Sequence, residues 1–123
     1  MLLKIKILKI IFLALLISHS LFSQNTNSNP ENDKRVIYRI ASYSVEIDKL
    51  VQEEFINDES TKIIFTCIPA GILVFESKIQ ITPQIAEAIQ NKLKKSSSTI
   101  HFFQLQGFTL SEAEKECSNF RSN

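Results

Sequence analysis

The side chains best suited to chemistry in this 123-residue sequence are its two cysteines and one of its histidines. Cys67 and Cys117 are the only cysteines, and His101 lies between them. Thiolates and imidazoles can hold zinc or copper, but a closed site needs a fourth ligand and the spacing shows neither CxxC nor HxxxH. In an oxidising compartment the two cysteines would form a disulfide, and otherwise they would be small buried hydrophobic residues. We favour the disulfide and keep a metal or small-ligand carrier using all three residues as the alternative.

A disulfide between the two cysteines depends on how the last helix packs. Cys67 lies near the end of a predicted strand, on the same side as Ile63 and Phe65. Cys117 lies on the apolar stripe of the last predicted helix. The two meet only if that helix returns over the strand, because Cα atoms more than about 7 Å apart cannot be bridged. His101 falls in an apolar strand segment, where a hydrogen-bonded structural role is expected.

Motifs for catalysis are missing from the sequence. It has no GxSxG nucleophile motif, and two glycines are too few for a glycine-rich phosphate loop. Glu53 and Glu54 fit a solvated helix face better than acid–base catalysis, because adjacent helix positions point about 100° apart. Further along, Glu112, Glu114 and Glu116 fit helix capping and solubility better than acid–base catalysis. We therefore expect a protein that is not an enzyme and that uses no cofactor.

Residues 1–23 have the layout of a secretory signal peptide. The apolar run Ile10–Ile17 precedes small polar residues and follows three basic ones, Lys4, Lys6 and Lys9. Cleavage is expected before Leu21 or before Gln24, and the pattern leaves the choice open. The run is shorter than the roughly 20 apolar residues of a membrane-spanning helix, so an uncleaved anchor is the less favoured alternative. We expect a periplasmic or secreted protein that contacts a membrane only if this segment is retained.

The chain beyond the signal predicts a short linker and one domain. Residues 24–34 contain no large apolar side chain, which is typical of a disordered linker. Residues 35–123 are enough for a single hydrophobic core. Beyond the signal, 11 basic and 13 acidic residues give a net charge of −2. This slightly acidic, mixed surface does not favour nucleic-acid binding, which depends on clustered basic residues.

Hydrophobic periodicity predicts four strands and three helices in this domain. The strands are expected at 36–41, 63–68, 72–76 and 99–105. The helices are expected to begin after the caps Ser44 and Thr82, and at the capping box Ser111-Glu112-Ala113-Glu114. The last helix should carry Ala113, Cys117 and Phe120 on one side. Between the second and third strands, Pro69 and Gly71 predict a hairpin turn.

The order strand–helix–strand–strand–helix–strand–helix predicts an α+β fold, a ferredoxin-like βαββαβ sandwich with an extra C-terminal helix. The central strands are apolar on both faces, whereas a sheet covered on one side only should alternate with polar residues. We expect the third helix or a partner to cover the second face.

The element order over residues 35–105 resembles that of the heavy-metal-associated domains. Those domains carry Met-x-Cys-x-x-Cys between the first strand and the first helix, where this chain has Ile40-Ala41-Ser42-Tyr43-Ser44-Val45-Glu46. The resemblance is in topology only, and it implies the fold without metal transfer. Other ferredoxin-like modules, including the propeptide-type protease inhibitors and the peptidoglycan-binding SPOR domains, are similar in layout.

Together these features predict an exported, non-enzymatic binding or assembly module of the cell envelope. It would associate with itself or with an envelope protein through a sheet face or an edge strand.

Overall fold

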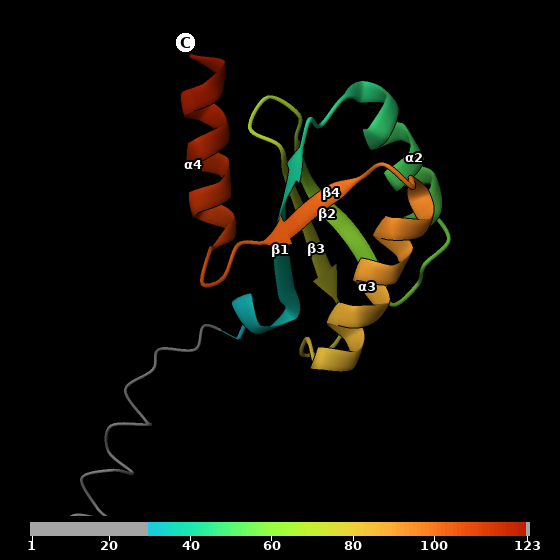
Figure 1. Cartoon of the computed structure of the whole chain (residues 1–123). Coiled ribbons are helices and arrows are strands. Elements are labelled where there is room, and N and C mark those ends of the chain that lie inside the picture. The colour runs from blue at the N-terminus through green and yellow to red at the C-terminus, as the bar shows by residue number, and fades with distance from the viewer. Residues whose placement is uncertain (1–29, 123) are drawn as a thin grey trace, which may run out of the picture.

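A four-stranded antiparallel sheet lies between two layers of helices (Figure 1). This computed structural model describes residues 30–122. The predicted signal peptide and residues 24–29 of the predicted linker lie outside this range. Among the helices that are described, none is long and apolar enough to cross a membrane.

The predicted α+β class is confirmed, with four strands and three α-helices among residues 30–122. The sheet has the strand order β2-β3-β1-β4, so β2 and β4 form its edges. A short 3₁₀ helix, η1, precedes the first strand. In chain order the elements are η1 (Asn32–Lys34), β1 (Arg35–Ala41), α2 (Val45–Phe55), β2 (Thr61–Cys67), β3 (Ile72–Ser77), α3 (Pro83–Ser96), β4 (His101–Gln104) and α4 (Leu110–Arg121).

Each α-helix begins at a hydroxyl side chain that accepts a backbone hydrogen bond, which satisfies one of the donors left free in the first turn. Ser44 and Thr82 cap α2 and α3, as predicted. The prediction for α4 is wrong, because its cap is Thr109 and Ser111 lies inside the helix. The Thr109 hydroxyl accepts from the backbone N–H of Glu112 at 3.2 Å and donates to the Glu112 carboxylate at 3.0 Å.

The larger core lies between the sheet and the pair α2 and α3. At its centre Tyr38 is fully buried and makes edge-to-face contacts with Phe75 and Phe102. Its hydroxyl accepts a hydrogen bond from Gln90 of α3 at 3.5 Å. Burial raises the pKa of this phenol, while the bond from Gln90 acts in the opposite direction. The buried members of the core are Val36, Tyr38, Ile40, Val51, Phe55, Leu73, Phe75, Ile89, Leu93 and Ile100.

A second core lies on the opposite face, where α4 packs against the sheet (Figure 1). The prediction that a helix covers this face is therefore confirmed for the middle of the sheet. Ala113 and Cys117 point inward as expected, whereas Phe120 at the end of α4 is 49% exposed and takes no part in either core. The buried members of this second core are Ile37, Cys67, Ala70, Ile72, Val74, Ala113 and Cys117.

Strand β2 contains a β-bulge that changes which side chains share a face. The pairing with β3 shifts between Ile63 and Phe65. As a result Ile63 packs against the α2–α3 core, whereas Phe65 and Cys67 belong to the α4 side. The prediction that Ile63 faces the same side as Cys67 is wrong, because the extra residue, Ile64, reverses the alternation upstream of it.

The folded part begins a few residues before the predicted boundary. Asn32–Lys34 form η1 instead of continuing a disordered linker. The carbonyl of Asp33 accepts a hydrogen bond from the backbone N–H of Ile81 at 2.8 Å. This bond ties the segment to the connection between β3 and α3, an interaction between distant residues that composition cannot predict.

Candidate functional site

Cys67 and Cys117 form a disulfide in the structure, with their Cα atoms 5.9 Å apart. The bridge joins the end of β2 to the middle of α4 across 50 residues of sequence. Both cysteines are buried, Cys67 completely. The geometric condition set by the sequence is therefore met, since the last helix does return over the strand.

His101 lies far from the disulfide. It begins β4 at one edge of the sheet, while Cys67 ends β2 at the other edge. Three strand spacings separate the edges, or about 14 Å. The expected structural hydrogen bond is not seen either, since the side chain is exposed and makes no hydrogen bond within residues 30–122.

The structure therefore does not bring together the three residues of the carrier alternative. A metal site needs cysteine as the free thiolate, and here each sulfur is bonded to the other. Among the described residues no group of three or more His, Cys, Asp or Glu side chains is placed to hold a metal ion.

The turn between β2 and β3 has the chemistry that Pro69 and Gly71 predict. The N–H of Gly71 donates to the carbonyl of Ile68 at 3.0 Å, which places Pro69 at the second position of the turn. Gly71 has φ +67°, and its carbonyl accepts from the N–H of Ile40 in β1 at 2.7 Å. Gly71 therefore combines a positive φ with a close backbone approach to β1.

Arg39 links α4 to the sheet beside this turn. Its guanidinium donates to the carboxylate of Glu116 on α4 and to the carbonyl of Ala70 at 3.2 Å. Its side chain and that of Glu116 are 29% and 25% exposed. Glu116 therefore links α4 to the sheet through Arg39, whereas Glu112 serves the helix cap.

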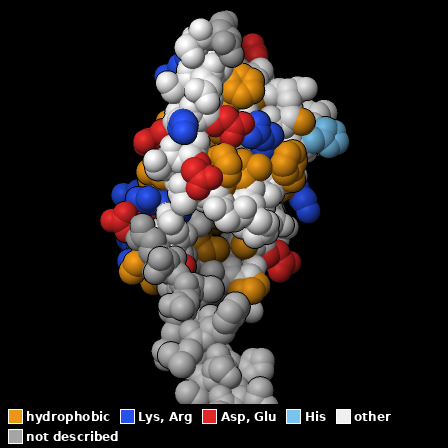
Figure 2. All heavy atoms as spheres, turned by 90° about the vertical axis from the view of Figure 1, so that its left-hand side faces the viewer, with side chains coloured by type: hydrophobic (Ala, Val, Ile, Leu, Met, Phe, Trp, Pro, Cys, Tyr) orange, Lys and Arg blue, Asp and Glu red, His pale blue; other side chains and the backbone are white. Residues whose placement is uncertain are grey.

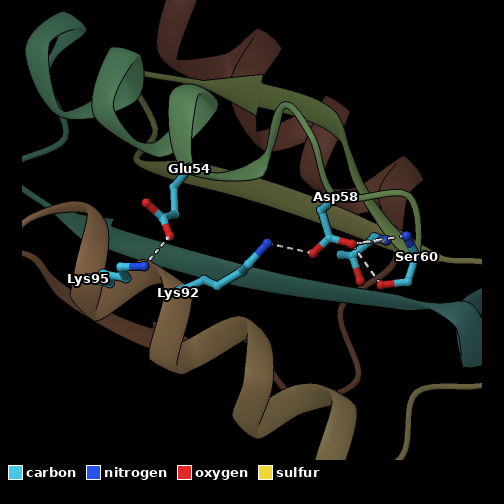
Figure 3. A network of polar contacts seen from close by, with 6 residues as sticks. Glu54, Asp58, Ser60, Lys92 and Lys95 are labelled. Carbon is cyan, nitrogen blue, oxygen red and sulfur yellow. Dashed lines mark hydrogen bonds and ion pairs between the residues drawn. The ribbon is translucent and has the colours of Figure 1, made fainter.

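Ion pairs connect α3 to α2 and to the loop that follows α2 (Figure 3). Lys92 donates to Asp58 at 2.8 Å, and its ammonium lies 5.0 Å from the centre of the Phe55 ring. Lys95 lies 3.7 Å from Glu54, which accounts for one of the neighbouring glutamates. Of the other two, Glu53 and Glu114 are exposed on helices, as expected for solvated faces.

Asp58 holds the loop between α2 and β2 in shape. Its side chain accepts from the backbone N–H groups of Ser60 and Thr61 at 2.9 and 3.1 Å, and from the Ser60 hydroxyl at 2.7 Å. Burial alone would raise the pKa of this carboxyl. The bonds from Lys92, Ser60 and Thr61 outweigh burial and lower the pKa to about 2.

We expect Asp58→Asn to lower the free energy of unfolding at neutral pH by about 1–2 kcal/mol, because the carboxylate is more strongly bonded in the folded state. A depressed pKa contributes stability above the ordinary value of 3.8, and this contribution is lost as the pH falls through about 2. The difference between wild type and variant should therefore shrink between about pH 4 and pH 2. Urea unfolding over this range measures it, with Glu59→Gln at an exposed neighbouring position as the control. A difference that does not change with pH would contradict the assignment.

A shallow hollow of about 250 Å³ lies beside this network. Its lining includes Phe55 and the 76%-exposed Ile56, together with Asp58. Because the Asp58 carboxylate is already bonded to Lys92 and to the loop backbone, the hollow is part of the loop structure and offers no free carboxylate to a ligand.

A second polar network ties α2 to β2. The hydroxyl of Tyr43 donates to Asp48, and the Gln52 amide donates to Asp48 and to Thr66 at 3.3 Å each. Burial, followed by the bond to Asp48 and its negative charge, raises the pKa of Tyr43 well above its usual range. This phenol therefore stays protonated, and the network holds the start of α2 in place.

The two edges of the sheet differ in their protection against pairing with another strand. The β2 edge carries the bulge near Ile64 and the exposed Lys62, both of which discourage edge pairing. The β4 edge carries no charge between Ile100 and Leu105. On β4, Phe103 is 56% exposed and lies on the same face as α4. Figure 2, which faces α4, shows hydrophobic side chains reaching the surface alongside this helix.

Sequence reasoning did not single out Phe103, because the adjacent Phe102 and Phe103 predicted a strand buried on both faces. A charge-free segment at the end of the βαββαβ pattern is the signal that could have indicated an edge strand open to pairing.

Comparisons with protein families, with curated proteins and with solved structures found no match to this chain.

Proposed function

We propose that this chain is an exported, non-enzymatic binding or assembly module of the cell envelope. The observation that carries the proposal is the β4 edge, which is free of charge and bears an exposed phenylalanine, while the other edge is protected. Open edges of this kind bind extended strands through backbone hydrogen bonds. The middle of the sheet face is covered by α4, so the edge and not the face is the proposed interaction surface.

We also propose a ferredoxin-like arrangement for the domain. In support, α2 and α3 each connect two strands that have one other strand between them, and both helices pack on the same face. The resemblance to the heavy-metal-associated domains stays one of topology, because residues 40–46 contain no cysteine.

The disulfide supports the proposed export to the periplasm or the cell exterior. Disulfides persist in oxidising compartments and are rare in the reducing cytosol. The signal-peptide layout of residues 1–23 points to the same destination.

Photo-crosslinking in cells tests the binding function. A benzophenone analogue of phenylalanine at position 103 of the full-length exported chain is expected to give a protein adduct. The same analogue in place of Ile79, which is 62% exposed in the connection between β3 and α3, is the matched control and should not. No adduct at position 103, or equal labelling at both positions, would contradict a binding function at this edge.

A further inference from the structure

We propose that the β4 edge pairs with the β4 edge of a second copy of this chain, forming an antiparallel dimer with its two-fold axis at Phe103. This inference rests on the proposed binding function and names its partner. Three features of β4 support it: the backbone register, the self-complementary arrangement of the outward backbone groups, and the absence of Lys, Arg, Asp and Glu from the segment.

The register shows which backbone groups of β4 face outward. The N–H of Leu105 donates to the carbonyl of Ile37 in β1 at 2.8 Å. In an antiparallel pair, residues that exchange hydrogen bonds alternate with residues that do not. Phe103, paired with Arg39, therefore also turns its backbone toward β1. The backbone groups of Phe102 and Gln104 point the other way, so that two N–H and two C=O groups line the open edge.

These groups are self-complementary about Phe103. When two β4 strands run antiparallel with Phe103 opposite Phe103 of the second copy, each Phe102 faces Gln104 of the other copy. Each such pair can exchange two hydrogen bonds, which satisfies all four outward groups on both strands. A two-fold interface requires this kind of self-matching.

The exposed side chain fits the same register. Residues opposite each other without exchanged hydrogen bonds bring their side chains close together, and aromatic pairs at such positions are favourable. The two Phe103 rings would meet on the face that carries α4, which would bury a side chain that is 56% exposed in the single chain.

Charge also favours a second copy. The paired segment Ile100–Leu105 contains no Lys, Arg, Asp or Glu, so no like charges would meet across the axis. The nearest charged pair on this face, Arg39 with Glu116, is internally neutralised. The β2 edge cannot form the same pairing, because its bulge breaks the register. In addition, the Lys62 side chains of the two copies would bring like charges together. The short strand implies a small and reversible interface.

Introducing a charge at position 103 tests the dimer. Sedimentation equilibrium of the exported, disulfide-bonded chain is expected to show a monomer–dimer equilibrium. Phe103→Lys and Phe103→Glu should each raise the dimer dissociation constant by about tenfold or more, since like charges then face each other. An equimolar mixture of the two variants should recover the association. Ile79→Lys, an exposed apolar position away from β4, should associate like the wild type.

A backbone variant tests the register independently of side-chain charge. Gln104→Pro removes an outward N–H, and proline is tolerated at edge positions where the N–H faces solvent. The variant should stay folded, with an unchanged circular dichroism spectrum, and should lose dimerisation.

Two outcomes would overturn the dimer. One is a wild-type chain that stays monomeric at up to about 1 mM, the upper end of weak association. The other is a dimer that persists in Phe103→Lys, in Phe103→Glu and in Gln104→Pro. If the crosslink at position 103 joins the chain to a different protein, the proposal that the partner is a second copy is wrong, while the binding function stands. If position 103 gives no adduct at all, the binding function itself fails.

Discussion

Replacing Cys67 and Cys117 together by alanine is expected to lower the free energy of unfolding by about 4 kcal/mol. The disulfide closes a loop of 50 residues, and a loop of this size restricts the unfolded chain by that amount in the chain-entropy model. Domains of this size are stable by only about 5–15 kcal/mol, so the loss is a large share of the total. Thermal unfolding should show a fall in Tm of at least about 15 °C.

Reductant provides the control for this effect. Dithiothreitol should shift the Tm of the wild type toward that of the double alanine variant and should leave the variant unchanged. Thiol titration of the exported, denatured protein without reductant should find no free thiol. Two free thiols in that titration would show that the cysteines are not bonded, and both would then be core residues only.

Gly71→Val should destabilise the domain by roughly 3–5 kcal/mol, because two penalties act at one position. A Cβ atom on Gly71 would lie 2.6 Å from the carbonyl oxygen of Ile40, which is backbone held in the central strand β1. The φ of +67° is also unfavourable for a residue with a side chain. Gly71→Ala should be milder than valine because alanine is not β-branched, but it meets the same contact.

A comparison with Gly107 distinguishes the cost of the positive φ at Gly71 from the cost of the contact with Ile40. Gly107 has a similar φ of +69°, and a Cβ placed there would have no atom within 4 Å. Gly107→Ala should therefore cost about 1 kcal/mol, the price of the positive φ alone. Urea unfolding of both alanine variants measures the difference, which reports the contact with Ile40. Equal losses at Gly71 and Gly107 would mean that the backbone around Ile40 moves aside.

Local chemistry in the sequence determined much of the fold. Ser44 and Thr82 cap their helices because a hydroxyl before an apolar periodic segment needs only neighbouring backbone donors to act. Pro69 and Gly71 make their turn for the same reason, since the proline ring fixes φ and glycine permits a positive φ, both within the same four residues. Where two hydroxyl residues can each cap a helix, as at Thr109 and Ser111, the local pattern predicted Ser111 and the structure uses Thr109.

The register within β2 was decided only by tertiary packing. Ile63, Ile64 and Phe65 are all apolar, so either face could have accepted each of them. The bulge follows from how β2 meets β3 and α4, which are contacts between distant residues.

The sequence by itself also determined that Cys67 and Cys117 could meet only under a returning helix, and the packing of α4 brings them together. The βαββαβ pattern points to β2 and β4 as edges, but only the pairings between residues far apart in the chain establish the strand order. That order separates His101 from Cys67 and leaves Phe103 at an open edge. The strand order therefore removes the shared site of the carrier alternative and creates the proposed interaction surface.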